Sequence, residues 1–150
     1  MAVFPYGVSR QYLEQSVREL RLPVRIQNHV DEADMVLTLK NYYRRKDSPV
    51  RTAESSGIPI QVLRSNTVSQ IKGALSRVYG VESDPEASAL QETREAISRA
   101  QQNRDEVELS PQNSYIRRLQ HQLVEQHALH ARSTGSEPNR RLVILKPEDE

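Results

Sequence analysis

The alternation of strand-like and helix-like segments over residues 1–80 limits the fold of this chain more than any other feature. Short apolar runs bounded by turn residues predict strands, and they lie at 2–5, 24–27, 35–39 and 58–63. Predicted helices begin at about Ser9, Ser48 and either Asn66 or Thr67. The run MVLTL at 35–39 is almost continuously apolar, as in a strand covered on both faces. We therefore expect an α/β domain with a small, mostly parallel sheet and helices on its faces.

A change of composition divides the chain into two predicted domains. Segment 81–86 (VESDPE) combines turn residues with charges, which is typical of a linker. We expect one domain at 1–80, a second at 87–147 and a short acidic tail at 148–150. Domains of this size bury a modest core, so each half is expected to be marginally stable.

The second half has a different order of elements. One helix is expected at about 87–102, with its charges facing water. Another is expected from Asn113 or Ser114 to about Leu129, with its inward face formed by Ile116, Leu119 and Leu123. Short strands are expected near 107–109, 130–133 and 141–145. The order helix, strand, helix, strand, strand predicts a small α+β domain.

The composition narrows the class of protein. The chain contains 36% hydrophobic and 27% charged residues and no cysteine, which excludes disulfides, thiolate zinc sites and cysteine nucleophiles within these residues. No apolar run approaches the roughly 20 residues that span a bilayer, and the first residues lack the pattern of a signal peptide. We expect no membrane partner, and a location in the cytoplasm or an equivalent compartment such as the plastid stroma.

The formal charge is unevenly distributed along the chain. Residues 1–80 carry 12 basic and 7 acidic side chains, residues 81–110 carry 3 and 8, and residues 111–150 carry 6 and 5. Two basic bodies therefore flank an acidic connector. Basic surfaces favour polyanionic partners, although a surplus this small is also common on ordinary surfaces.

Arg117 and His121 are the residues most suggestive of function. They lie four apart on a predicted helix and are therefore neighbours on one face. A guanidinium can hold phosphate oxygens with two hydrogen bonds, and an imidazole can exchange hydrogen bonds or stack on a base. Arg118, Arg140 and Arg141 could extend this cationic face. By spacing alone, an ordinary solvated face is the more common explanation.

The surrounding sequence resembles the R-three-H domain of single-stranded nucleic-acid-binding proteins. The stretch VELSPQNSYIRRLQHQLVEQHAL carries the pair Arg117 and His121, and a GxEPxR-like turn follows at 135–140. The resemblance covers about 60 residues and implies a three-stranded sheet with two helices. It also implies single-stranded RNA or DNA as the partner, without choosing between them.

A wider resemblance extends toward the N-terminus. The segments FPYGVSRQYLEQSVRELRLPVRI, DEADMVLTL and IPIQVLRSNTVSQIKGAL resemble a cyanobacterial and plastid family that joins an AAA-type ATPase domain to an R-three-H domain. This chain lacks a Gly-rich phosphate loop ending in Lys and Ser or Thr, so ATP hydrolysis by these residues is not expected. An AAA-type ATPase domain, in the same chain or another, is a partner that the resemblance implies.

Asn41–Lys46 (NYYRRK) forms a second candidate site, because ligands of open parallel sheets bind beyond the carboxyl ends of strands. Tyr42, Tyr43, Arg44, Arg45 and Lys46 could stack bases and contact phosphates. The alternative, which we favour, is a charged loop leading into a surface helix with one tyrosine packed inward.

Other combinations of residues are weaker candidates. His121, His127 and His130 cluster within ten residues, but His121 and His127 fall on different helical faces, and no suitable carboxylate completes a zinc site. The acidic cluster Asp31, Glu32 and Asp34 is more typical of a solvated turn than of a magnesium site. No nucleophile motif or catalytic triad is evident. We therefore expect a binding protein without metal or other cofactor, and not an enzyme. The alternative is a protein-interaction or regulatory module.

Overall fold

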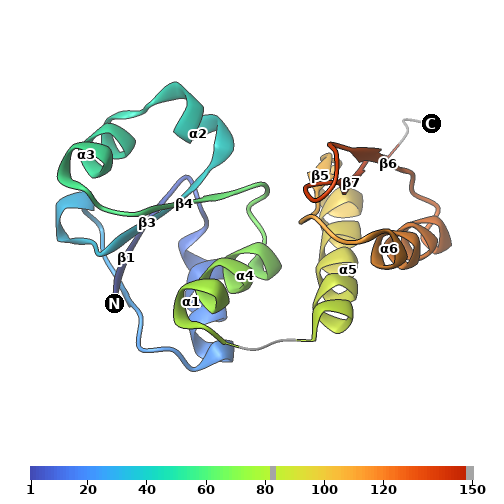
Figure 1. Cartoon of the computed structure of the whole chain (residues 1–150), viewed down its shortest axis with the longest axis horizontal. Coiled ribbons are helices and arrows are strands. Elements are labelled where there is room, and N and C mark those ends of the chain that lie inside the picture. Colours follow the sequence, from blue (N-terminus) through green and yellow to red (C-terminus); the bar gives the residue numbers. More distant parts are fainter. Residues whose placement is uncertain (82–83, 148–150) are drawn as a thin grey trace. The chain divides into compact units, whose positions relative to one another are not determined.

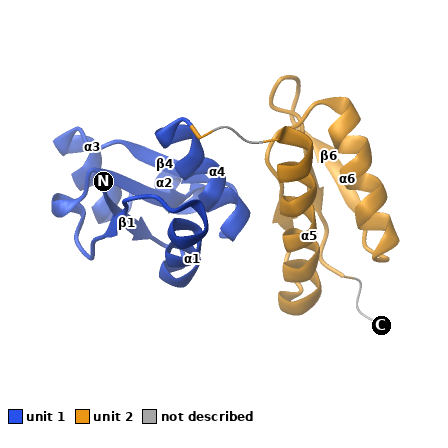
Figure 2. Cartoon of the chain, turned by 90° about the horizontal axis from the view of Figure 1, so that it is seen from below, with its two compact units in different colours: residues 1–80 blue, residues 81–150 orange. Residues whose placement is uncertain are grey.

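The computed structural model describes residues 1–81 and 84–147. The chain divides into two compact units, Met1–Gly80 (unit 1) and Val81–Glu150 (unit 2), coloured separately in Figure 2. Residues 82 and 83 of the expected linker and the acidic tail at 148–150 lie outside the described residues. The rest of the expected linker is partly helical, because Asp84 caps a helix that begins at Pro85. Among the helices of residues 1–81 and 84–147, none combines the length and the apolar character that spanning a bilayer requires.

Unit 1 is an α/β domain with a four-stranded parallel sheet, as the sequence predicts. Its strand order is β2-β1-β3-β4. In chain order its elements are β1 (Ala2–Tyr6), α1 (Arg10–Leu20), β2 (Arg25–Ile26), η1 (Val30–Glu32), β3 (Met35–Leu39), α2 (Lys40–Arg45), α3 (Ser48–Ser56), β4 (Ile60–Leu63) and α4 (Val68–Tyr79).

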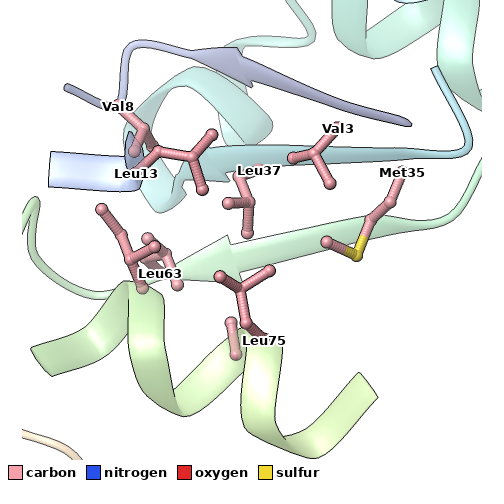
Figure 3. Close-up of a cluster of buried hydrophobic side chains, with 9 residues drawn as sticks. Val3, Val8, Leu13, Met35, Leu37, Leu63 and Leu75 are labelled. Atoms are coloured by element: carbon pink, nitrogen blue, oxygen red, sulfur yellow. The ribbon is translucent and has the colours of Figure 1, made fainter. Parts of the chain in front are cut away.

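Helices cover both faces of this sheet. Figure 1 shows α1 and α4 together on one side of the strands, with α2 and α3 on the other. The core beneath α1 and α4 is apolar, and Figure 3 shows Leu13, Leu37, Leu63 and Leu75 converging there from two helices and two strands. Residues on both faces of β3 are buried, which explains its nearly continuous apolar sequence.

The predicted helix caps of unit 1 are present. The hydroxyl of Ser9 accepts a hydrogen bond from the Tyr12 amide and so caps α1. Of the two residues proposed for the last helix, Thr67 caps α4 by accepting from the Gln70 amide. The other, Asn66, accepts a hydrogen bond from the Ser9 amide and ties the segment before α4 to the start of α1.

Lys46 is a left-handed C-cap, but residues 41–45 are helical, contrary to the expected loop. They form most of α2, which follows β3 without an intervening loop. The segment is less than two turns long, so it shows no apolar period, and its charges suggested a loop instead. The helix brings this segment to the edge of the sheet where β1 and β3 both end.

Unit 2 is an α+β domain with a three-stranded antiparallel sheet in the order β5-β7-β6, together with two helices. The predicted architecture is confirmed. Its elements are α5 (Pro85–Asn103), β5 (Val107–Glu108), α6 (Ser114–Gln126), β6 (Ala131–Thr134) and β7 (Arg141–Ile144). The two helices pack together, and apolar side chains of α5, α6 and the sheet form the core.

Two details of α6 differ from the prediction. The helix ends at Gln126, short of Leu129, and Ala128 has a positive φ of 58°. The fully buried stripe is Ile116, Gln120 and Val124, at spacings of four, whereas Leu119 and Leu123 are only partly buried. Gln120 was missed because its side chain is polar. Its amide has no hydrogen-bond partner among the described residues.

Candidate nucleic-acid interface

One face of α6 and the adjoining sheet form a groove of about 350 Å³. Six of the lining residues come from α6 and the others from strands β6 and β7 and the turn between them. The lining residues are Ser114, Arg117, Arg118, His121, Gln122, Glu125, Ser133, Arg140 and Leu142. Because three arginines and one glutamate line the groove, it favours an anionic ligand.

Arg117 is the most firmly placed cation of the groove. Its side chain is 12% exposed, and one guanidinium nitrogen contacts Glu137 Oε1 at 2.9 Å. The same nitrogen donates to the backbone carbonyl of Gln112 at 2.7 Å. A cation held at two points loses little rotamer freedom when a phosphate arrives. Arg117 is therefore preorganised to bind an anion. The Glu137 carboxylate would compete with such an anion for the guanidinium.

A buried carboxylate supports the loop before α6. Glu92 of α5 is 6% exposed and accepts hydrogen bonds from both the amide and the hydroxyl of Ser110, at 3.0 and 2.9 Å. The Gln112 amide in turn donates to the Arg140 carbonyl at 3.3 Å. The expectation that the charges of α5 all face water is wrong at Glu92. This carboxylate holds the loop whose carbonyl orients Arg117.

His121 lies one turn beyond Arg117 on the same helix face, as its spacing predicts. Its side chain is 41% exposed, and Nε2 lies 3.3 Å from Glu125 Oε1. A protonated imidazole forms an ion pair with that carboxylate, whereas a neutral one remains available to exchange a hydrogen bond with a ligand.

The other predicted arginines are placed differently. Arg118 lines the groove and is exposed, with no acidic partner in the described part of the chain. Arg140 also lines it, and its Nε donates to the Ser133 hydroxyl at 2.7 Å. Arg141 does not line the groove. Its guanidinium pairs with Glu108 of β5 and donates to the Asn139 carbonyl, which fixes the turn before β7.

The turn between β6 and β7 depends on Gly135. Its φ is +80°, and a Cβ there would lie 2.6 Å from the Arg141 guanidinium and 3.1 Å from the Asn139 carbonyl oxygen. A side chain here is therefore disfavoured by the positive φ, and both the Arg141 guanidinium and the Asn139 carbonyl would have to shift to admit it. The turn includes a cis peptide bond between Glu137 and Pro138 and carries Glu137 to Arg117.

The second candidate segment, on α2, is largely occupied by contacts within unit 1. The Tyr42 ring lies edge-on to Tyr6, with ring centroids 5.4 Å apart, and the Arg45 guanidinium lies 4.8 Å from the centroid of the Tyr42 ring. Lys46 Nζ lies 4.0 Å above the Tyr43 ring and 2.8 Å from Glu54 Oε1. Arg44 is exposed. One tyrosine is packed inward, as the favoured interpretation expects.

Asp47 links this segment to β1. Its carboxylate accepts two hydrogen bonds from Arg45 and one from the Tyr6 hydroxyl at 2.9 Å. The Arg45 hydrogen bond, followed by the one from Tyr6, holds the pKa of Asp47 below its ordinary value. The same contacts with Asp47 raise the pKa of Arg45 and of the Tyr6 hydroxyl. The hydrogen bond from Lys46 to Glu54 raises the lysine pKa.

Tyr42 fills the position where a sheet of this topology commonly binds ligands. Chain connections leave β1 and β3 in opposite directions, so a crevice is expected between their carboxyl ends. Gly7, with φ of +73°, lies there, and a Cβ on it would be 2.2 Å from the Tyr42 ring. The ring therefore takes the space beside the end of β1.

Members of the histidine and acidic clusters make hydrogen bonds to the backbone. His127 Nδ1 contacts the Leu123 carbonyl at 3.0 Å, and an Asp34 carboxylate oxygen accepts the Ala2 amide at 2.8 Å. Within residues 1–81 and 84–147, no group of three His, Cys, Asp or Glu side chains is placed to hold a metal ion.

Sequence reasoning missed several lining residues. Ser114 and Glu125 lie three residues before and eight after Arg117, so the helical period could have found them. Ser133, which lines the groove, and Glu137, which pairs with Arg117, come from the β6–β7 hairpin, and no local pattern links them to α6. Only the tertiary fold brings them to Arg117 and Arg140.

Comparison with known proteins assigns each unit. Residues 1–79, just over half of the chain, match the family model described as phosphotyrosine protein phosphatase. The chain belongs to that family. Residues 88–146 match the model of the R-three-H domain, which confirms that resemblance over unit 2 and includes the whole groove.

One relative matches across both units. The uncharacterized protein ycf45 of Porphyra purpurea is 29% identical over 157 residues, which takes in 95% of this chain. The chain spans only 28% of the length of that relative. The likeness therefore concerns the pair of units seen here and not the remainder of the longer protein.

Proposed function

We propose that this chain binds single-stranded nucleic acid, RNA or DNA, through the α6 groove, mainly by contacts to the phosphate backbone. R-three-H domains are generally single-stranded nucleic-acid binders. The observation that carries the proposal is that Arg117, Arg118, His121 and Arg140 line one groove of about 350 Å³ in the unit that matches this domain.

Each side chain has a distinct role in this proposal. Arg117 is already oriented and exchanges the Glu137 carboxylate for a phosphate oxygen. Arg118 has no acidic partner among the described residues and adds a flexible cation. Arg140 reaches the groove from the strand side, and His121 contacts sugar, phosphate or base. Arg141 stabilises the turn before β7 and does not contact the ligand in this proposal.

The test is a fluorescence-anisotropy titration of labelled single-stranded RNA and DNA with the whole chain at roughly 50 and 200 mM salt. We expect binding that weakens steeply at the higher salt, because released counterions drive the association. A double variant, Arg117→Ala with His121→Ala, should lose most of this binding.

A matched control removes the same two residue types elsewhere. Arg77 and His29 are exposed on unit 1, so Arg77→Ala with His29→Ala changes the charge equally without touching the groove. Equal losses in the two double variants would assign binding to overall charge. Binding of neither strand at low salt would contradict the proposal.

We propose further that the chain acts by binding and not by catalysis. The name of the family of unit 1 raises a phosphatase activity as the alternative. Two observations argue against it: these residues include no cysteine to act as a thiolate nucleophile, and the Tyr42 ring fills the crevice beside β1. Incubation with p-nitrophenyl phosphate should release no nitrophenol above a heat-denatured control. Steady release by the folded chain would refute this view.

A protein-interaction role is the second candidate. It is favoured by the length of the ycf45 relative, of which the matched region is only 28%. In this proposal the partner is an AAA-type ATPase domain, in the same chain or in another. The proposed location is the cytoplasm or the plastid stroma. This role predicts a stable protein complex and no salt-dependent nucleic-acid binding.

A further inference from the structure

Tyr115 is an unusually placed aromatic residue. The residue is 56% exposed, whereas the other six aromatic residues of the described chain are all partly covered. Within residues 1–81 and 84–147, the Tyr115 side chain has no hydrogen bond, ring contact or cation over its ring. Asn113 caps α6, so Tyr115 serves no capping role.

Helix geometry places Tyr115 at the rim of the groove. Successive residues of an α-helix are about 100° apart, so Tyr115, Arg118 and Gln122 form one stripe at spacings of three and four. Arg118 and Gln122 both line the groove. The buried stripe of Ile116 and its neighbours lies on another face of α6. The ring is thus beside the proposed phosphate contacts and outside the core.

We propose that Tyr115 is a stacking platform for an unpaired base of the bound strand. The inference rests on the proposed function and extends it from the backbone to the bases. Every base presents a π-face, so one exposed ring can bind bases without choosing a sequence. A base in a duplex is already stacked on both sides, so Tyr115 gives the groove its selectivity for single strands.

The test compares substitutions that separate the aromatic ring from size and charge. Tyr115→Phe keeps the ring, Tyr115→Leu keeps an apolar side chain, and Tyr115→Ala removes both. The exposed position makes all three compatible with the fold, which circular dichroism of each variant verifies. The probes are a single-stranded oligonucleotide, its fully abasic counterpart of the same length, and the corresponding duplex.

Stacking is worth roughly 5- to 150-fold in affinity per base. We expect Tyr115→Ala and Tyr115→Leu to lose at least about fivefold on the base-bearing strand, and Tyr115→Phe to stay within about twofold of wild type. All three variants should bind the abasic strand like wild type. Their preference for the single strand over the duplex should shrink in parallel with the loss of stacking.

The outcomes separate this inference from the proposed function. If Tyr115→Ala binds the base-bearing strand like wild type while Arg117→Ala does not, the stacking role is refuted. Binding of the strand in the groove would then still be supported. Equal losses on base-bearing and abasic strands would also refute stacking. If wild type binds no strand at low salt, both the proposed function and the stacking role fail.

Discussion

Two short helical segments of this chain have similar residues and different surroundings. Segment 41–46 (NYYRRK) on α2 and segment 114–121 (SYIRRLQH) on α6 each combine tyrosine with two adjacent arginines. On α2 the two rings are covered by cations of the same segment, and Arg45 and Lys46 have carboxylate partners. On α6, Tyr115 and Arg118 have no such partner within the described residues. Availability to a ligand thus depends on neighbours and not on residue type.

The difference is one of geometry more than of ion-pair strength. Exposed ion pairs such as those of Arg45 and Lys46 are weak in water, so a polyanion could displace them. The Tyr42 ring, however, is packed against Gly7 and Tyr6, so moving it would break contacts at the end of β1. On α6 the competing groups, Glu137 and Glu125, are exposed carboxylates that can move aside.

The largest effect is expected at Gly7, and it tests whether the position of the Tyr42 ring is fixed by packing in unit 1. Gly7→Ala should destabilise unit 1 by about 2–4 kcal/mol, because it adds a methyl group against the ring to the cost of a positive φ. Gly57 has a similar φ of +71° and open space around it, so Gly57→Ala should cost only about 1 kcal/mol. Urea unfolding followed by circular dichroism measures both. Equal costs would show that the ring moves freely.

The next prediction compares one arginine from each segment. Arg117→Ala should weaken single-strand binding by about tenfold or more, because it removes a charge-assisted hydrogen bond to phosphate. Arg45→Ala removes the same side chain from α2 and should change affinity by less than about twofold. Anisotropy titrations at one salt concentration provide the comparison. A larger loss of affinity for Arg45→Ala than for Arg117→Ala would indicate that the strand binds at α2 instead of α6.

A smaller effect on single-strand affinity, an increase instead of a loss, is expected at Glu137. Replacing this carboxylate with an amide in Glu137→Gln removes the anion that competes for Arg117 and should tighten binding by about two- to fivefold. Glu106→Gln is the matched control, since Glu106 pairs with Arg132 in the same unit without lining the groove. If both variants tighten binding equally, the gain reflects net charge and not the exchange at Arg117.

The smallest effect concerns how the hydrogen bonds of Asp47 with Arg45 and Tyr6 make the stability of unit 1 depend on pH. The pKa of Asp47 is lowered in the folded chain by Arg45 and Tyr6, so its carboxylate stabilises the fold at pH values above the ordinary aspartate pKa of about 3.9. That contribution is lost as pH falls through the lowered pKa. Asp47→Asn should therefore be less stable than wild type at pH 7, and the difference should close below about pH 4.

Urea midpoints at neutral and acidic pH measure this difference. Asp31→Asn removes the same charge from exposed η1 and serves as the control. A gap between Asp47→Asn and wild type that persists unchanged at acidic pH would contradict the proposed role of the carboxylate.

The sequence was a good guide where local periods or caps carry the information. The run Met35–Leu39 indicated a doubly covered strand, and Ser9, Thr67 and Asn113 indicated helix starts, because these signals depend on near neighbours. The same approach missed α2, which is too short for a period. It also missed the burial of Gln120, because a helical face was judged by apolar residues alone.

The sequence by itself determined the order of the elements other than η1 and α2, the division into an α/β and an α+β unit, and the pairing of Arg117 with His121 on one helical face. These follow from spacing along the chain. Only the tertiary structure decided which charged and aromatic groups remain accessible. Glu137 contacts Arg117 from 20 residues away in the sequence. The Tyr42 ring, on the helix that follows β3, lies beside Gly7, which follows β1. Such contacts depend on how strands and turns pack, and no local pattern encodes them.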